Sequence, residues 1–322
     1  MKPEWITRAY WPGDEVKILE LFSAAYGGRK MSEQYWEWMF AQGPFGPGVI
    51  TLLFEGEKLI GHYALAPMDI FVCRAPVRAL LSMTTMTHPD YGKQGIFSHL
   101  LRETCERSAE LGFTLVYGFP NDNSNPGFLR QGWKNFGKVA EYVCRAPGTP
   151  ARPLPGIAPI NRFEAEADRL WEQAASHVGI TVARKAAYLN WRFFDHPTAR
   201  YRAHGFFSGS RLRGYVVTKV YAPEGKPAKG HLIDLAACSV AEARVLVQTG
   251  LNALGAHSVT EVSAWFPHDS YAGIACRQEG FLPRETETNW GMMLLKPEDE
   301  VLRGQLEDSG GWYLTMANSD VY

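Results

Sequence analysis

The sequence lacks the features that mark several large classes of protein. Its 322 residues include 33 Lys and Arg against 34 Asp and Glu, a net charge of −1, so no basic excess favours contact with nucleic-acid phosphates. No run of about 18 uncharged apolar residues is present to cross a membrane. The first residues contain no apolar stretch typical of a secretory signal. We therefore expect a cytoplasmic protein that binds neither nucleic acid nor membrane.

Cysteine is scarce and follows no pattern. The five cysteines are widely spaced and form neither a CxxC pair nor the spacing of a zinc site. They are Cys73, Cys105, Cys144, Cys238 and Cys276. Reduced thiols buried as small apolar groups are the expected state, and no metal is expected.

What the sequence does contain is enough apolar material for more than one core. Hydrophobic residues make up 46% of the chain and aromatic residues 13%, and the length predicts two domains or one large domain. The aromatic surplus favours packed cores, with a remainder that can line a ligand pocket. Five tryptophans are expected mainly in cores: Trp36, Trp38, Trp191, Trp265 and Trp290.

A proline-rich segment, residues 146–159, divides the chain into two similar halves. Its five prolines cannot continue a helix or a central strand. Four matching positions in the halves are separated by a constant 153 residues: Tyr35 and Tyr188, Trp38 and Trp191, Phe54 and Phe207, Gly61 and Gly214. We predict two copies of one domain, residues 1–146 and 160–322, joined by a linker at 147–159.

Periodicity predicts an α/β fold in which each copy has a mixed, mostly antiparallel sheet flanked by helices. Helices are expected at 14–26, 97–111 and 164–178, with a short one ending at Gly132. Strands are expected at 49–54, 58–66, 69–73, 77–87 and 114–119, and a short strand is expected in the tail at 311–322.

The loop between the strand at 77–87 and the following helix is the most informative segment. Gly92 and Gly95 allow a ligand to approach the backbone closely, and the positive end of the following helix favours an anion. No Gly-Lys-Ser or Gly-Lys-Thr follows, and no GxGxxG is present, which argues against a nucleotide-hydrolysing loop and a dinucleotide fold.

This loop, Gly92-Lys93-Gln94-Gly95-Ile96-Phe97, resembles the acyl-CoA-binding motif of the GNAT superfamily of N-acyltransferases. The family pattern is (Gln/Arg)-x-x-Gly-x-(Gly/Ala), and of its three signature positions only Gly95 matches. A second segment, with Asn121, Ser124, Phe128 and Gly132-Trp133 at the family spacing, resembles the closing Asn-x-x-Ala-x-x-x-Tyr-x-x-x-Gly-Phe of the family. The resemblance covers residues 5–140 well and 160–295 weakly.

The resemblance implies a site for acetyl-CoA as the acyl donor. The diphosphate would lie on backbone amides of the loop and the first helical turn, that is, residues Gly92, Lys93, Gln94, Gly95, Ile96, Phe97 and Ser98. The pantetheine would run beside Thr85, Met86 and Thr87, with the N–H of Met86 or Thr87 polarising the thioester carbonyl. Asn121, Ser124 and Phe128 would contact its other side.

The sequence offers several candidates for the groups that transfer protons. Phe128 stands where many relatives have a tyrosine that protonates the leaving thiolate, so Tyr117, Tyr91 or Ser124 replaces it, or the thiolate leaves unassisted. Asp122, Glu33 and His88 are candidates for the base that deprotonates the amine, and we favour Asp122 as base and Tyr117 as acid.

The predicted activity is transfer of an acetyl group from acetyl-CoA to a small amine or amino sugar. Two alternatives are a non-catalytic acyl-CoA-binding regulatory module and a Fem-type aminoacyl or peptidyl transferase, which the balanced charge disfavours. The second copy has no glycine between its corresponding strand and helix, near Cys238, so we expect it to shape the acceptor pocket or to support the first. A monomer and a homodimer are both open.

Overall fold

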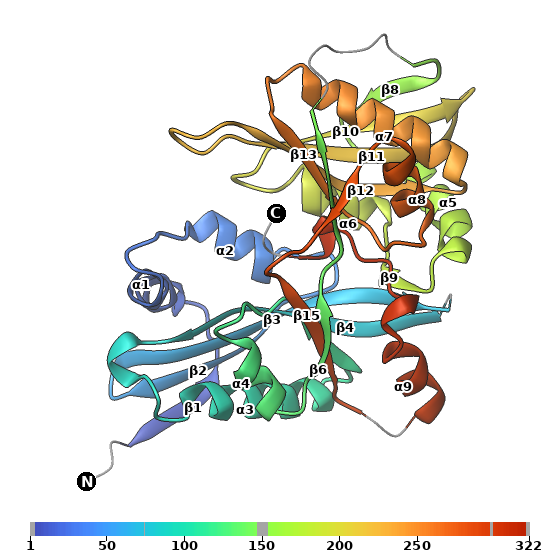
Figure 1. Ribbon diagram of the computed structural model, residues 1–322. Coiled ribbons are helices and arrows are strands. Elements are labelled where there is room, and N and C mark those ends of the chain that lie inside the picture. Colours follow the sequence, from blue (N-terminus) through green and yellow to red (C-terminus); the bar gives the residue numbers. More distant parts are fainter. Residues whose placement is uncertain (1–3, 74, 147–153, 297–298, 320–322) are drawn as a thin grey trace. The chain divides into compact units, whose positions relative to one another are not determined.

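The computed structural model describes residues 4–73, 75–146, 154–296 and 299–319 (Figure 1). The chain divides into two compact units. The N-terminal unit comprises Met1–Asp69, Val77–Gly137 and Thr288–Arg303, and the C-terminal unit comprises Ile70–Pro76, Lys138–Glu287 and Gly304–Tyr322.

The N-terminal unit is built around a mostly antiparallel sheet. Its strands are β1 (Trp5–Ala9), β2 (Val49–Glu55), β3 (Lys58–Val72), β4 (Ala75–Thr87), β5 (Leu115–Gly118), β6 (Lys134–Lys138) and β15 (Asn289–Leu294). Its helices are α1 (Glu15–Ala25), α2 (Glu33–Phe40), α3 (Ile96–Glu110) and α4 (Asn125–Arg130). The strand order is β1-β2-β3-β4-β5-β15-β6, in which β4 and β5 are parallel.

The C-terminal unit has the same order of elements around a second sheet. Its strands are β7 (Glu141–Arg145), β8 (Ile157–Ile160), β9 (Ile180–Val182), β10 (Tyr201–Ser208), β11 (Arg211–Tyr221), β12 (Lys229–Ala237), β13 (Glu261–Trp265) and β14 (Leu282–Arg284). Its helices are α5 (Ala165–Ala174), α6 (Ala186–Phe193), α7 (Val240–Gly255) and α8 (Tyr271–Gln278), and α9 (Glu300–Leu306) crosses the boundary between the units. The strand order is β14-β7-β13-β12-β11-β10-β8, with β12 and β13 parallel.

The two sheets exchange one strand each. Strand β7 follows β6 in the chain but pairs with β13 and β14, and β15 follows β14 but lies between β5 and β6. In Figure 1 the orange β15 accordingly lies among blue and green strands. The compact units therefore differ from the continuous ranges 1–146 and 160–322 in these segments. Residues 70–72 at the end of β3 belong to the C-terminal unit, where they pair with β9, a strand outside the seven-stranded sheet of that unit.

The repeat that the sequence predicts has a matching structural basis. Helices α2 and α6 begin and end 153 residues apart, and so do the starts of β3 and β11. Gly61 lies against α3, where an added Cβ would be 2.7 Å from the Cγ2 of Ile96. Gly214 lies against α7, where an added Cβ would be 2.7 Å from the Cδ1 of Leu246. Both glycines therefore let a helix pack closely on its sheet.

Several expected elements differ from those observed. Residues 69–73 form no separate strand, because β3 continues without a break to Val72. The tail contains two short 3₁₀ turns, Ser309–Gly311 and Met316–Asn318, instead of a strand, and residues 320–322 lie outside the described residues. Part of the expected linker forms β8, an edge strand paired with β10, where a proline is tolerated; residues 147–153 are outside the described part.

The cores hold the tryptophans that the sequence analysis assigned to them. Exposed fractions are 6% or less for all five: Trp36, Trp38, Trp191, Trp265 and Trp290. All five cysteines are free thiols. The core of the N-terminal unit includes Leu100, Leu101 and Cys105 of α3 against Leu53 and Tyr63 of the sheet.

Candidate functional site

The site begins where the two parallel strands of the N-terminal sheet stop pairing. Strand β5 pairs with β4 from Ala79 to Ser82, and the pairing ends at Ser82 and Gly118. Strand β4 then continues to Thr87. Because the strands are parallel, the end of β4 and the loop after β5 meet at the same edge of the sheet, where α/β proteins bind ligands. Of the last three residues of β4, Met86 is buried and Thr85 and Thr87 are half-buried.

The loop after β4 turns sharply into α3. A 3₁₀ turn, Pro89–Tyr91, is capped by His88, whose Nδ1 accepts a hydrogen bond from the N–H of Asp90 at 3.3 Å. Lys93 and Gly95 then adopt positive φ values of +62° and +83°. His88 was a candidate base, and the structure gives its imidazole a role in the turn.

The N-terminus of α3 has donors without internal acceptors. The residue at the cap is Gly95, no side chain caps the helix, and no acidic residue lies in its first turn. Within the described residues, the N–H groups of 93–98 donate no hydrogen bond to a protein acceptor. Gly92, Lys93, Gln94 and Gly95 are exposed. Unsatisfied N–H groups at the positive end of a helix favour an anion, as the sequence motif predicts.

The first side chains of α3 point into the core, so only their backbone is available at this end. Ile96 is 1% exposed. The ring of Phe97 contacts that of Phe128 edge-to-face, with 5.0 Å between centroids. Phe128 is itself a core residue, packed also against Trp133. The structure thus brings Phe97 and Phe128 together as packing partners. Whether either contacts a ligand stays a prediction.

The loop after β5 is organised by Asn121. Its side-chain oxygen accepts hydrogen bonds from the N–H groups of Asn123 and Ser124, both at 3.0 Å, an arrangement that starts α4. The hydroxyl of Ser124 donates back to Asn121. The structure therefore brings Asn121 and Ser124 together within the loop, and their contact with a pantetheine stays a prediction.

Asp122 in the same loop has a partner that the sequence analysis missed. Its Oδ1 accepts a hydrogen bond from the Nδ2 of Asn289 at 2.8 Å, and Asn289 also donates to the carbonyl of Pro120 at 3.3 Å. Asn289 begins β15, the strand that the C-terminal half supplies to this sheet. No local signal connects two residues so far apart in sequence, because only the strand exchange brings them together.

The remaining acid and base candidates have clear positions. Tyr117 lies in β5, 1% exposed, with its ring edge-to-face to that of Phe119. Tyr91 donates its hydroxyl proton to the carboxylate of Glu55, which raises the pKa of Tyr91 and ties it to that carboxylate. Glu33 is exposed in the first turn of α2, behind the N-cap Ser32. None of these positions assigns a proton-transfer role.

The family comparison agrees with this geometry. The profile described as "Acetyltransferase (GNAT) domain" matches residues 7–135. Residues 7–135 form a GNAT domain. The match covers the uncapped helix, both parallel strands and the loop after β5, whereas β15 lies outside it. No curated protein sequence matches the chain.

Solved structures with similar folds extend over both units. A probable N-acyltransferase from Enterococcus faecalis V583 has a TM-score of 0.68 at 14% identity, covering 91% of this chain and 73% of that chain. A GCN5-related N-acetyltransferase from Anabaena variabilis has a TM-score of 0.69 at 12% identity, with the same coverage. Saccharomyces cerevisiae N-myristoyltransferase, solved with myristoyl-CoA, has a TM-score of 0.64 at 8% identity, covering 91% and 80%. At these identities the likeness shows the fold.

The helix of the C-terminal unit that corresponds to α3 is capped. Ser239 at the N-cap of α7 accepts a hydrogen bond from the N–H of Glu242 at 3.2 Å, and the Glu242 carboxylate accepts one from the N–H of Cys238 at 3.1 Å. The Ser239 hydroxyl thus caps α7, and the Glu242 carboxylate binds the N–H of the residue before the cap. Arg213 binds the same carboxylate at 2.7 Å. Side chains therefore bind two N–H groups at the start of α7, those of Cys238 and Glu242, and one of these side chains is acidic.

The strand end of the C-terminal unit is also covered from within. Pairing of β12 with β13 ends at Leu232 and Ala264, and β12 continues to Ala237. The hydroxyl of Tyr313 donates to the carbonyl of Leu235 at 2.8 Å, and that of Tyr271 approaches the same carbonyl at 3.5 Å. Both tyrosines belong to this unit, so its own side chains occupy the position equivalent to the strand end in the GNAT domain.

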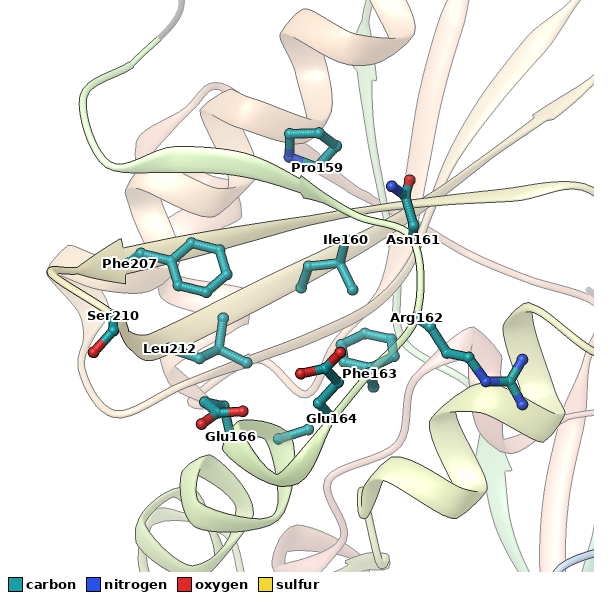
Figure 2. Close-up of a pocket in the computed structure, with 11 residues that line it drawn as sticks. Pro159, Ile160, Asn161, Arg162, Phe163, Glu164, Glu166, Phe207, Ser210 and Leu212 are labelled. Atoms are coloured by element: carbon teal, nitrogen blue, oxygen red, sulfur yellow. The ribbon is translucent and has the colours of Figure 1, made fainter.

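The C-terminal unit has an open hollow of about 530 Å³ between β8, the start of α5 and the β10–β11 hairpin. Figure 2 shows apolar side chains of Ile160, Phe207 and Leu212 along it. Arg162 extends away to form an ion pair with Asp195 at 2.8 Å, and Glu166 pairs with Arg169. The lining therefore offers apolar surface and carboxylates, and no cluster of cations for a phosphate.

Two further searches concern the described residues only. No group of three or more His, Cys, Asp or Glu side chains there is arranged to hold a metal ion. None of the helices in these ranges combines the length and the apolar character needed to span a bilayer.

Proposed function

We propose that the GNAT domain binds acetyl-CoA and transfers its acetyl group to a small amine or amino sugar. The observation that carries this proposal is the N-terminus of α3, which has no cap, no acidic residue in its first turn and open N–H groups. The exposed Lys93 beside it makes no ion pair within the described ranges. A diphosphate supplies the negative charge and the acceptors that this end of the helix lacks.

The end of β4 supplies the second part of the site. The backbone of 83–87 has no partner from β5, since the pairing ends at Ser82. An extended pantetheine can therefore add to this edge as a short strand would, through main-chain hydrogen bonds. The N–H of Met86 then donates to the thioester oxygen, and this bond strengthens as negative charge develops on that oxygen during attack.

The reaction follows as direct attack of the neutral amine on the thioester carbon. The attack forms the C–N bond and a tetrahedral oxyanion, whose collapse breaks the C–S bond and releases the CoA thiolate. In this proposal Asp122 takes the proton from the amine, and Asn289 orients its carboxylate through the 2.8 Å hydrogen bond. A thiol with a pKa of about 8.5 leaves without obligatory help from an acid, which fits a phenylalanine at position 128.

Calorimetric titration with CoA and acetyl-CoA tests the proposal. The wild-type protein is expected to bind one CoA per chain with a Kd below 1 mM, corresponding to about 4 kcal/mol. Gly95→Asp is expected to weaken binding at least ~100-fold, because it places a carboxylate beside the diphosphate. Absence of binding by the wild-type protein at millimolar CoA would contradict the proposal.

Gly95→Asn is the matched control for this substitution. Asn and Asp have the same shape, both tolerate positive φ better than other side chains, and a Cβ at Gly95 meets nothing within 4 Å. The asparagine variant should keep most of the affinity. If both variants lose CoA binding equally, the loss comes from the backbone and not from the charge.

A non-catalytic acyl-CoA-binding module is the second candidate, and one observation favours it. Phe128 has no hydroxyl, and the hydroxyl of Tyr91 is bound to Glu55, so neither supplies the acid of many relatives. Release of CoA thiol from acetyl-CoA in the presence of a panel of small amines and amino sugars separates the candidates. Binding without amine-dependent release would favour the module over the enzyme.

A further inference from the structure

A strained residue interrupts β4 just past the point where β5 stops pairing. Thr84 has a φ of +47°, a left-handed conformation that costs free energy for any residue with a side chain and most for a β-branched one. Four non-glycine residues in the described ranges have positive φ, and Thr84 is the β-branched one. A left-handed residue within a strand is typical of a bulge, which re-aims the backbone that follows.

A buried histidine on the neighbouring strand β3 forms a hydrogen bond to the backbone at Thr84. The Nδ1 of His62 in β3 lies 2.8 Å from the carbonyl oxygen of Thr84. Because a carbonyl only accepts, Nδ1 carries the proton and Nε2 is left with its lone pair. His62 is 0% exposed, and burial lowers the pKa of its imidazole to about 4, so the ring is neutral at physiological pH.

This arrangement lowers the stability of the fold. Within the described residues, both the Nε2 of His62 and the hydroxyl of Thr84 are buried without a hydrogen-bond partner. An apolar side chain at position 62 would avoid one of these unsatisfied groups. Strain and unpaired polar groups at one place indicate that the local geometry is maintained for a purpose other than stability.

Thr84 stands two residues after the last β4 residue that pairs with β5, Ser82, and two residues before Met86. The φ and ψ angles of Thr84 therefore decide in which direction the following peptide N–H groups point. We infer that His62 is a positioning residue of the acyl-transfer site, whose Nδ1–H bond to the Thr84 carbonyl orients the backbone that follows, so that the N–H of Met86 or Thr87 faces the thioester oxygen. This inference rests on the proposed function.

Infrared spectroscopy of bound acetyl-CoA, labelled with ¹³C at the thioester carbonyl, tests the inference without needing the acceptor. A donated hydrogen bond lowers the carbonyl stretching frequency, and the wild-type protein is expected to show this shift. His62→Leu introduces an apolar side chain of similar size that has no hydrogen-bond donor. It should bind CoA within about threefold of wild type and lose the carbonyl shift. If acyl transfer is measurable, kcat should fall roughly 10- to 100-fold with little change in KM.

His62→Asn is the conservative control, because its amide places an N–H donor near the position of Nδ1. It should restore the carbonyl shift and most of kcat. An unchanged carbonyl frequency in His62→Leu would overturn the inference. Equal loss of the shift in both variants would also overturn it, since His62 would then act through packing alone.

A second pair of variants covers the case in which His62→Leu does not fold. Glycine adopts positive φ without strain, so Thr84→Gly should fold with or without the hydrogen bond from His62. The carbonyl shift should be smaller in the double variant His62→Leu, Thr84→Gly than in Thr84→Gly, and equal shifts would overturn the inference. Failure of the wild-type protein to bind CoA is a separate result that overturns the proposed function itself, and this inference falls with it.

Discussion

The two units share one order of strands and helices and differ at the same structural position. In the GNAT domain, α3 begins at a glycine with no cap and an exposed lysine nearby. In the C-terminal unit, the side chains of Ser239 and Glu242 at the start of α7 bind the N–H groups of Glu242 and Cys238. The comparison teaches that the same arrangement of sheet and helix accepts a helix start without a cap as well as one capped by side chains.

The strand ends differ in the same sense. The end of β4 in the GNAT domain has no partner from β5 after Ser82. The equivalent carbonyl in the C-terminal unit, that of Leu235, is bound by Tyr313 of the tail. Residues 312–319 are all buried, with the fully enclosed Thr315 and Met316 among them. In the C-terminal unit, a side chain of the buried tail therefore covers the strand end.

The largest expected difference between the units concerns their ion pairs. Asp234 in the C-terminal unit is 0% exposed and accepts hydrogen bonds from Arg184, Tyr215 and Thr315. Asp234→Ala leaves the Arg184 guanidinium buried without its counter-charge and should cost about 3–5 kcal/mol in the free energy of unfolding. Asp14→Ala breaks the more exposed ion pair with Arg8 in the GNAT domain and should cost about 1–2 kcal/mol in the free energy of unfolding. Urea unfolding measures both, and equal losses would contradict the contrast.

Acid should affect the C-terminal unit before the GNAT domain. Burial lowers the pKa of His231 to about 4 and that of His196 to about 3, whereas the GNAT domain has His62 with a pKa of about 4. An unfolded histidine has a pKa of about 6.5, so the unfolded chain binds more protons in this window. The stability from each neutral histidine is present above pH 6.5 and falls by up to about 1.4 kcal/mol per pH unit toward pH 4.

Hydrogen exchange resolved by segment, at pH 7 and pH 5, checks this order of acid sensitivity. Amides of the C-terminal sheet should lose more protection than those of the N-terminal sheet. His231→Gln removes one titrating group and should reduce the loss. Equal pH sensitivity of the two sheets would show that groups other than these histidines control acid unfolding.

The N-cap of α7 should contribute to stability and not to ligand binding. Ser239→Ala removes the acceptor for the N–H of Glu242 and should cost about 1 kcal/mol in unfolding free energy, with CoA affinity unchanged. Ser32→Ala at the N-cap of α2, whose hydroxyl accepts from Tyr35, should cost a similar amount. A change of CoA affinity in Ser239→Ala would mean that the C-terminal unit contributes to the ligand site.

The smallest expected effect concerns the exposed lysine in the loop before α3. Lys93→Gln should weaken CoA binding about two- to fivefold at low salt, and the difference should shrink as salt screens the charge. Lys226→Gln, an exposed lysine in the C-terminal unit, is the control and should leave CoA binding unchanged. If both substitutions weakened CoA binding equally, Lys93 would contribute only through general electrostatic attraction and not through a local contact.

Much of the fold is predictable from the sequence because its signals are local. The periodicity of residues 14–26 and 97–111 agrees with α1 and α3 to within a residue at each end, since an apolar face repeats with the helix turn. The constant offset of 153 residues predicts the repeat, because Gly61 and Gly214 both admit a helix against their sheets. The tail was predicted wrongly as a strand, since its buried 3₁₀ turns depend on partners such as Asp234.

The features of the candidate site also separate into those set by local sequence and those set by tertiary structure. The sequence by itself determined the loop with Gly95, because positive φ and an uncapped helix start are properties of neighbouring residues. Only the tertiary structure decided the partner of Asp122, because Asn289 arrives on a strand exchanged from the other half. It alone also joined His62 to Thr84, since a hydrogen bond between two strands depends on how they pair, and neither residue carries a local mark of that contact.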